Sequence, residues 1–167
     1  KSLLRNKHCV SNIGDFDKDT FFHRILWDHA LDKENGFIKL KESSKIKKVI
    51  LCSGKVYFDL LDAREKLKRD DVVFYRIEQL YPFPVKSLVK EIKKYAKNAK
   101  FYWCQEEPKN MGAWFSVRDY IQWTLETIKA NNSKIFYIGR SPDASPATGY
   151  AKRHISQQQE IIKKVFE

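Results

Sequence analysis

Apolar residues follow two alternating spacings along residues 47–167. Short continuous apolar runs, typical of buried strands, occur four times; they are residues 49–52, 72–77, 100–104 and 135–138. Apolar residues at intervals of three and four, typical of one face of a helix, follow each run; they span residues 56–67, 84–95, 114–128 and 155–166. Continuous apolar strands separated by helices predict an α/β fold, with a mostly parallel sheet covered by helices on both faces. Right-handed crossovers would place the four loops that follow the strands along one edge of that sheet.

The first 45 residues lack this alternation. Residues 21–27 are apolar enough for a strand or a buried arm, and Glu34-Asn35-Gly36 predicts a turn. We therefore expect an N-terminal arm over residues 1–45 that does not fold alone, followed by one α/β domain over residues 46–167. Because the first residue is Lys1 rather than methionine, we also expect a piece of a longer protein.

Composition and charge narrow the classes of partner. Hydrophobic residues make up 43% of the 167 residues, which is enough for one core, and no apolar run reaches the roughly 20 residues that cross a bilayer. The net charge of +11 raises the question of a polyanion partner. The lysines are spread along the chain with acidic residues between them, and no nucleic-acid motif accompanies them. We expect a solvated lysine-rich surface, with neither a nucleic acid nor a membrane as partner.

Residues suited to catalysis or metal binding form no recognisable set. The three cysteines and four histidines have no metal-ligand spacing, which predicts buried thiols in a reducing compartment and no metal site. Ser53-Gly54-Lys55 lies where a strand meets a helix and would suit an anion, but it is not a P-loop. A glycine that eases a tight turn is the plainer interpretation.

Two polar loops are candidate contact surfaces. Glu106 and Glu107 would suit an acid–base pair, yet adjacent residues on an extended loop point apart, so ion pairs across an interface are favoured. The loop over residues 139–149 contains two prolines and two glycines, and its hydroxyl groups would satisfy either backbone groups or a ligand. We favour a rigid connection that packs against a neighbour.

Five segments in the same order resemble one family; they are Lys1-Ser2-Leu3-Leu4-Arg5, Cys52 to Tyr57, Arg76 to Pro84, Trp103 to Trp114 and Ser141 to Tyr150. The chain resembles the thiamine-dependent decarboxylating component of the 2-oxoglutarate dehydrogenase complex. The resemblance covers only the last portion of that long enzyme. It implies that residues 1–45 come from the end of the pyrimidine-binding domain and that residues 46–167 form the transketolase-type C-terminal domain. Met111 and Asp143 depart from the family pattern.

The resemblance also implies an activity for the whole enzyme. It would decarboxylate 2-oxoglutarate with thiamine diphosphate and magnesium, then transfer succinyl to a lipoyl group in the tricarboxylic acid cycle. In this chain Phe16 follows Gly14-Asp15, so the Gly-Asp-Gly element that holds magnesium and diphosphate is absent. The glutamate that activates the cofactor would lie before Lys1. We therefore expect no catalytic residue and no bound cofactor in this chain, which would be inactive alone.

The partners implied by the family are the rest of the polypeptide, a second copy in a homodimer, the lipoyl succinyltransferase and the dihydrolipoyl dehydrogenase. An AMP or acetyl-CoA effector is a further implied partner, and Arg5, Arg24, Lys55 and Arg76 are candidates to meet its phosphates. Interface ion pairs are the plainer role for these four residues. The predicted interface-loop residues are Glu78, Gln79, Gln105, Glu106, Glu107, Asn110 and Ser145. The family implies the cytoplasm in a bacterium or the mitochondrial matrix in a eukaryote.

Three alternatives stay open at this point. One is a free-standing α/β module that binds a nucleotide or a protein. Another is the same domain of a different thiamine-dependent oxo-acid enzyme. A basic nucleic-acid binder comes last.

Overall fold

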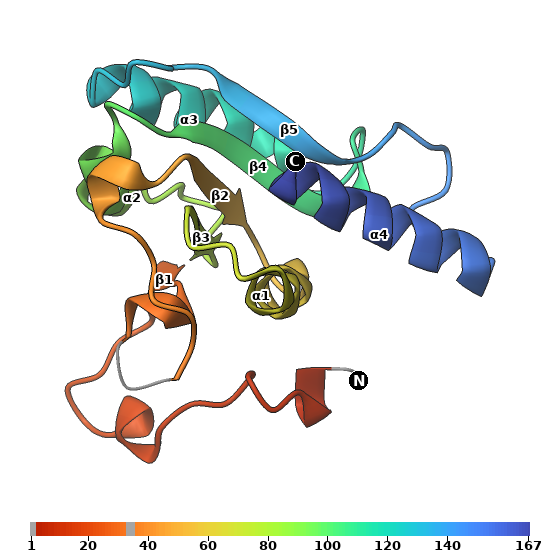
Figure 1. Ribbon diagram of the computed structural model, residues 1–167, viewed down its shortest axis with the longest axis horizontal. Coiled ribbons are helices and arrows are strands. Elements are labelled where there is room, and N and C mark those ends of the chain that lie inside the picture. Colours follow the sequence, from red (N-terminus) through yellow and green to blue (C-terminus); the bar gives the residue numbers. More distant parts are fainter. Residues whose placement is uncertain (1–2, 33–35) are drawn as a thin grey trace.

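The computed structural model describes residues 3–32 and 36–167, which contain a sheet of five strands (Figure 1). The strands are β1 (Ile25–Trp27), β2 (Lys48–Cys52), β3 (Val72–Ile77), β4 (Lys100–Pro108) and β5 (Ile135–Arg140). The α-helices are α1 (Val56–Leu67), α2 (Val85–Ile92), α3 (Trp114–Thr127) and α4 (Ala151–Phe166). Short 3-10 turns are η1 (Leu3–Arg5), η2 (Ile13–Phe16), η3 (His29–Leu31), η4 (Ser43–Lys45) and η5 (Lys93–Tyr95).

The sheet has the strand order β1-β3-β2-β4-β5. Strands β3, β2, β4 and β5 run parallel, and β1 is antiparallel to β3 at one end of the sheet. The predicted mostly parallel sheet is therefore confirmed. The carboxyl ends of the four parallel strands meet at one edge, which we call the carboxyl edge.

Helices cover both faces of the sheet, as predicted. Alternate strand residues point to opposite faces, so Val49 and Leu51 pack with α2 and α3, whereas Ile50 and Cys52 pack with α1 and α4. Figure 1 shows α4 and α3 on opposite sides of the β4–β5 pair. Burial of apolar residues on both faces explains why these strands are apolar at every position rather than at every second one.

The arm joins this sheet over a short stretch. Of the apolar residues 21–27, the last three form strand β1, and Ile25 is buried in the core beneath α2. Just after β1, buried Asp28 accepts two hydrogen bonds from the Arg64 guanidinium of α1 and one, at 2.9 Å, from the Phe74 amide of β3. The strand alternative predicted for this segment is thus confirmed for Ile25–Trp27.

Elsewhere the arm lies along one side of the molecule in 3-10 turns and irregular backbone (Figure 1). In the predicted turn Glu34-Asn35-Gly36, the first two residues lie outside the described residues, while Gly36 has a positive φ of 69°. The division of the chain at residue 45 stays a prediction.

Strand β4 is longer than predicted. The sequence indicated an end at Cys104, but the strand continues to Pro108, which pairs with Arg140 of β5 across an irregular register. Apolar spacing misses this extension because residues 105–107 are polar. Helix α4 likewise begins four residues before the predicted Ile155, because its first turns are exposed and carry no apolar pattern.

Candidate functional site

A groove of about 640 Å³ lies at the carboxyl edge, among the segments that follow β2, β3 and β4. It is lined by Ser53, Gly54, Lys55, Leu80, Tyr81, Trp103, Gln105, Glu106, Glu107, Gly112, Ala113, Ser116 and Tyr120. The crevice beyond the carboxyl ends of parallel strands is where open α/β sheets bind ligands. Several residues that the sequence singled out lie in this groove. The contacts that these residues make within the chain determine which of their polar groups are free to bind a partner.

Gln105 holds the end of β4 against the start of α3. Its Oε1 accepts hydrogen bonds from Trp103 Nε1 at 2.9 Å and from the Trp114 amide at 3.0 Å. Its Nε2 donates to the Met111 carbonyl at 2.7 Å and also contacts the Pro108 carbonyl at 3.2 Å. Gln105 is 4% exposed, and its predicted role in an interface loop stays a prediction. A buried amide with satisfied partners fixes the local structure.

Gly112 is required by this arrangement. Its φ is 64°, a conformation that favours glycine, and a Cβ at this position would lie 2.9 Å from Gln105 Nε2. The contact made by Met111 uses its backbone carbonyl, so the departure of this residue from the family pattern leaves the hydrogen bond in place.

Lys55 is held by two carboxylates at the floor of the groove. Its Nζ lies 2.9 Å from Glu106 Oε1 and 2.5 Å from Asp59 Oδ2, and Asp59 Oδ2 also accepts a hydrogen bond from Gln158 Nε2 at 2.9 Å. Burial alone would lower the pKa of Lys55, but the hydrogen bonds to Asp59 and Glu106 outweigh it, and the pKa is raised. Lys55 is therefore a cation whose charge is already balanced within the chain.

Glu106 and Glu107 face different surroundings. Glu106 contacts Lys55, whereas Glu107 is exposed and engages Tyr137 Oη through its carbonyl at 3.3 Å. Successive residues of a strand point to opposite sides. Glu106 thus forms an ion pair within the chain, and its predicted ion pair across an interface stays a prediction.

Arg76, near the end of β3, lies over aromatic rings of α1. Its guanidinium carbon is 4.5 Å from the Tyr57 ring centroid and 5.2 Å from that of Phe58. Its Nε is buried and has no hydrogen-bond partner in the described part of the chain. A buried donor without a partner is costly, so this atom is a place where a further acceptor would stabilise the protein.

His29 lies beside the same tyrosine. Its Nδ1 is 2.5 Å from Tyr57 Oη, and its backbone amide donates to the same oxygen at 2.9 Å. Burial and then the charge of Arg76 lower the pKa of His29. The arm and α1 therefore meet at the contact between His29 and Tyr57.

The other candidate phosphate contacts lie on the arm. Arg5 and Arg24 are exposed, and Arg24 lines a second groove of about 590 Å³ between β1 and α2. The Arg24 carbonyl accepts hydrogen bonds from the Glu78 and Gln79 amides. Lys55 and Arg24 thus lie in different grooves.

The predicted interface residues on the remaining loops are joined within the chain. Gln79 Nε2 donates to the Pro82 carbonyl at 2.6 Å, and Glu78 Oε1 is buried without a hydrogen-bond partner among the described residues. Asn110 exchanges two hydrogen bonds with the Asp143 backbone at 2.9 and 3.0 Å, and Ser145 Oγ donates to the Ala147 carbonyl at 2.7 Å. The Asp143 backbone makes the pair with Asn110, so that contact does not depend on its side chain.

Sequence reasoning missed two members of the Lys55 cluster. Asp59 is four residues after Lys55 on one helix, a spacing that favours an ion pair and was available in the sequence. Gln158 comes from α4, 99 residues further along, and only the fold brings it near.

Asp15, which follows Gly14 in the sequence, makes a local contact in the arm. Asp15 lies in η2, where its Oδ2 accepts a hydrogen bond from the Asn12 amide at 2.9 Å. Over residues 3–32 and 36–167, no group of three or more His, Cys, Asp or Glu side chains is placed to hold a metal ion. In that part of the chain, no helix has the length and apolar character needed to cross a membrane.

Comparison with known proteins gives consistent matches. A family model described as 2-oxoglutarate dehydrogenase C-terminal matches residues 10–166. The 2-oxoglutarate dehydrogenase E1 component of Brucella anthropi is 48% identical over 157 residues, and those of Brucella ovis and Brucella canis are equally similar. The match covers 94% of this chain but only 16% of each relative. The family model matches almost the whole chain, and the chain belongs to the 2-oxoglutarate dehydrogenase C-terminal family.

Proposed function

We propose that this chain is the C-terminal part of a 2-oxoglutarate dehydrogenase. Residues 46–167 would be its transketolase-type C-terminal domain, and residues 1–45 the end of the preceding pyrimidine-binding domain. The whole enzyme would use thiamine diphosphate and magnesium to decarboxylate 2-oxoglutarate and to transfer succinyl to a lipoyl group of the tricarboxylic acid cycle complex. The family match and the relatives at 48% identity support this proposal.

Within that enzyme, the chain would supply packing surfaces rather than reacting groups. The observation that carries this role is the exposed apolar surface of the arm, where Ile13, Phe16 and Phe21 are 92%, 79% and 74% exposed. Several large apolar side chains left exposed along one short segment are typical of a surface that another protein surface covers. We infer that the rest of the same polypeptide, or its second copy in a homodimer, covers these side chains.

The rim of the carboxyl edge would contribute to the same contacts. Leu80, Tyr81 and Tyr120 form an apolar wall of the groove, while Glu107 and Asn110 remain exposed beside it. An apolar centre with a polar rim is the usual composition of a protein interface. Glu78, Gln79, Glu106 and Ser145 would position this rim through the contacts described above.

Of the four candidates to bind the phosphates of a nucleotide effector such as AMP or acetyl-CoA, Arg76 is the one that the contacts favour most. Its buried Nε lacks a partner, whereas Lys55 is already paired with two carboxylates. Arg5 and Arg24 are exposed and would join only if the rest of the polypeptide brought a phosphate near them. Arg76→Lys should weaken effector binding, because a lysine loses the planar group that lies over Tyr57. Arg118→Lys, on the exposed face of α3, is the matched control, and equal affinities in the two variants would remove this role.

The partners and place in the cell follow from the proposed enzyme. They are the lipoyl succinyltransferase and dihydrolipoyl dehydrogenase, in the bacterial cytoplasm or the mitochondrial matrix of a eukaryote. Co-elution of the longer polypeptide with these two proteins would test the assembly.

The activity is tested by oxo-acid-dependent reduction of an electron acceptor, with thiamine diphosphate and magnesium present. We expect turnover of 2-oxoglutarate by the longer polypeptide that carries this chain, and none by residues 1–167 alone. A longer polypeptide that prefers another oxo acid would overturn the substrate assignment. Turnover by the isolated chain would overturn its role as a packing domain.

A further inference from the structure

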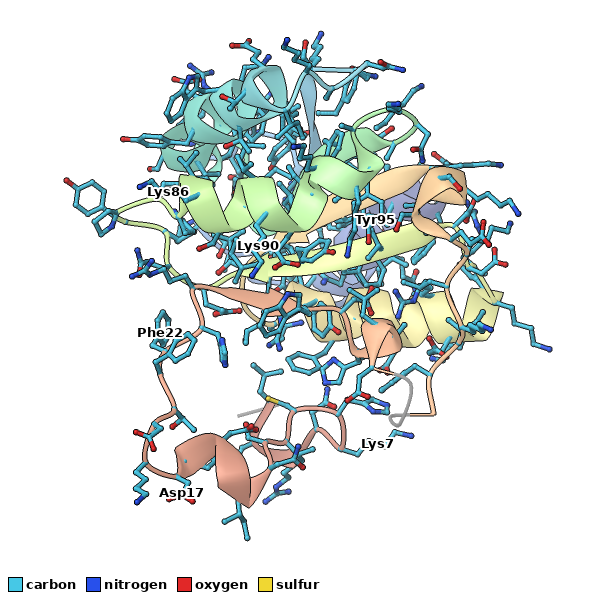
Figure 2. The ribbon with its side chains drawn as sticks, turned by 90° about the vertical axis from the view of Figure 1, so that its left-hand side faces the viewer. Lys7, Asp17, Phe22, Lys86, Lys90 and Tyr95 are labelled. Carbon is cyan, nitrogen blue, oxygen red and sulfur yellow. The ribbon has the colours of Figure 1, made fainter. Side chains whose placement is uncertain are left out.

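Five lysines gather on α2, on the 3-10 turn η5 that continues it and on the turn at residues 96–98. They are Lys86, Lys90, Lys93, Lys94 and Lys97, and all five are exposed. Figure 2 shows Lys86 and Lys90 on the side of the molecule that also presents Phe22 of the arm. We call these five residues the lysine stripe. Acidic residues were expected to interrupt any run of lysines, but among the described residues no acidic side chain lines the depression between η4 and η5 that four of these lysines share.

Spacing explains why the stripe forms. Lys86 and Lys90 are four positions apart on α2, a spacing that places them on one side of the helix. Lys93, Lys94 and Lys97 follow in η5 and the next turn, and they line the same depression as Lys90. The acidic residue of the segment, Glu91, follows Lys90 and lines the groove between β1 and α2, as Lys90 also does, but Glu91 does not line the depression between η4 and η5. The stripe extends over roughly 18 Å.

The charges of the stripe are not balanced within the described chain. None of its lysines forms an ion pair with a residue among 3–32 or 36–167. In that part of the chain their one ring contact is made by Lys94, whose Nζ lies 5.3 Å from the Tyr95 ring centroid. By contrast, Lys41, Lys47 and Lys55 all contact carboxylates. Unbalanced lysines on one helix create a positive potential that attracts an acidic partner.

The surface beside the stripe suits a polypeptide. An open depression of about 810 Å³ lies between η4 and η5, lined by four of the lysines together with Ser43, Ser44 and Asn98. The aliphatic stems of the lysines make its wall largely apolar. A segment with apolar side chains between carboxylates would use both the wall and the charges, whereas a nucleic-acid backbone would use the charges alone.

Lysine is depleted at the centres of stable protein interfaces. The stripe thus differs from the exposed aromatic residues of the arm, which suit permanent burial. We infer that the lysine stripe is a docking surface for an acidic segment of a separate protein, bound transiently and with strong dependence on salt. This inference does not rest on the oxo-acid chemistry of the proposed function.

The test uses the longer polypeptide that carries this chain and a labelled synthetic peptide of about twelve residues. The peptide has glutamate at alternate positions, with leucine and serine between them, and fluorescence anisotropy reports binding. We expect binding that weakens as salt rises from about 50 to 500 mM. The variant K86E/K90E/K93E/K97E should bind the peptide at least about tenfold more weakly.

The matched control is K18E/K66E/K152E/K164E, which changes the net charge equally at exposed lysines elsewhere. We expect its affinity for the peptide to stay within about twofold of the parent. A second variant has glutamine at the same four stripe positions. It removes the positive charges without adding negative ones, so weaker peptide binding by this variant cannot result from an effect of charge reversal on folding. Equal losses in stripe and control variants would overturn the inference, as would no peptide binding by the parent.

Two further arms separate other occupants. A DNA duplex and vesicles that contain phosphatidylserine are offered at the same salt concentrations, and tighter binding of either than of the peptide would overturn the inference. Acetylation of exposed lysines in the longer polypeptide, followed by mass spectrometry, should modify all five stripe lysines. Protection of the stripe would show that the polypeptide itself covers it and would also overturn the inference.

Discussion

The arm and the α/β body differ in where they put their aromatic and aliphatic side chains. In the body, the parallel strands are buried on both faces, and the largest residues, including Trp103 and Phe74, are almost inaccessible. In the arm, apolar residues such as Ile13 and Phe16 are exposed on isolated 3-10 turns. The body therefore completes its own core, whereas the arm requires a surface from elsewhere.

The arm is attached to the sheet by strand β1 and by the residue that follows it. β1 adds three residues to the sheet, and Asp28 places a carboxylate between Arg64 and the Phe74 amide. These contacts lie within a few residues of one another. The arm also contacts α1 outside this junction: His8 Nε2 lies 3.7 Å from Asp62 Oδ1, and the Ile38 amide donates to Glu65 Oε2 at 2.9 Å. Residues 10–24 are exposed throughout, and we infer that this segment depends on the rest of the polypeptide.

The largest predicted effect comes from removing that junction. Asp28→Ala leaves the buried Arg64 guanidinium without its carboxylate and should lower the free energy of unfolding by about 3–5 kcal/mol. Urea denaturation of the chain measures this loss. Asp119→Ala, which breaks the exposed pair with Arg118, is the control and should cost less than about 1 kcal/mol. Similar midpoints for the two variants would show that the junction contributes little.

A second effect should arise inside the body. Gln105→Leu removes the acceptor of Trp103 Nε1 and the Trp114 amide, and should lower the free energy of unfolding by about 2–3 kcal/mol. Gln79→Leu, at a less buried position, is the control. It tests whether removing any side-chain amide lowers the free energy of unfolding by the same amount. If both variants unfold at the parent's urea midpoint, Gln105 does not hold the loop as described.

Acid should loosen the junction through His29. Burial and then Arg76 lower the pKa of His29 in the folded chain below its ordinary value of 6.5. The unfolded chain therefore binds a proton first, so the contribution to stability is complete above pH 6.5 and is lost as pH falls through the folded pKa. His29→Asn should reduce the fall in the free energy of unfolding below pH 6.5. An unchanged pH profile would assign the acid sensitivity to other groups.

The smallest effect on stability is expected on the exposed part of the arm. Phe21→Ser combined with Phe22→Ser should change the free energy of unfolding by less than about 0.5 kcal/mol, because both side chains are exposed. The same pair should reduce self-association of the isolated chain, as measured by analytical ultracentrifugation. A large loss of stability would mean that these rings already pack within the chain.

The sequence predicted the body better than the site for a physical reason. Strands such as 72–77 and helices such as 56–67 carry periodic apolar patterns that report burial directly, and these elements were confirmed. The extension of β4 through Gln105 was missed, because a polar side chain satisfied by five local groups resembles a loop residue in a linear pattern. The pairing of Lys55 with Glu106 depends on two strands and a helix meeting at one edge. The family resemblance was available from ordered motifs and was confirmed, whereas the roles of the individual site residues stay predictions.

Hydrogen exchange over residues 10–24 tests the central claim most directly. The account predicts rapid amide exchange in this segment of the isolated chain and marked protection in the longer polypeptide, with β2 protected in both. Equal exchange of the segment in the two proteins would contradict it, because the arm would then have no covering surface in the longer polypeptide.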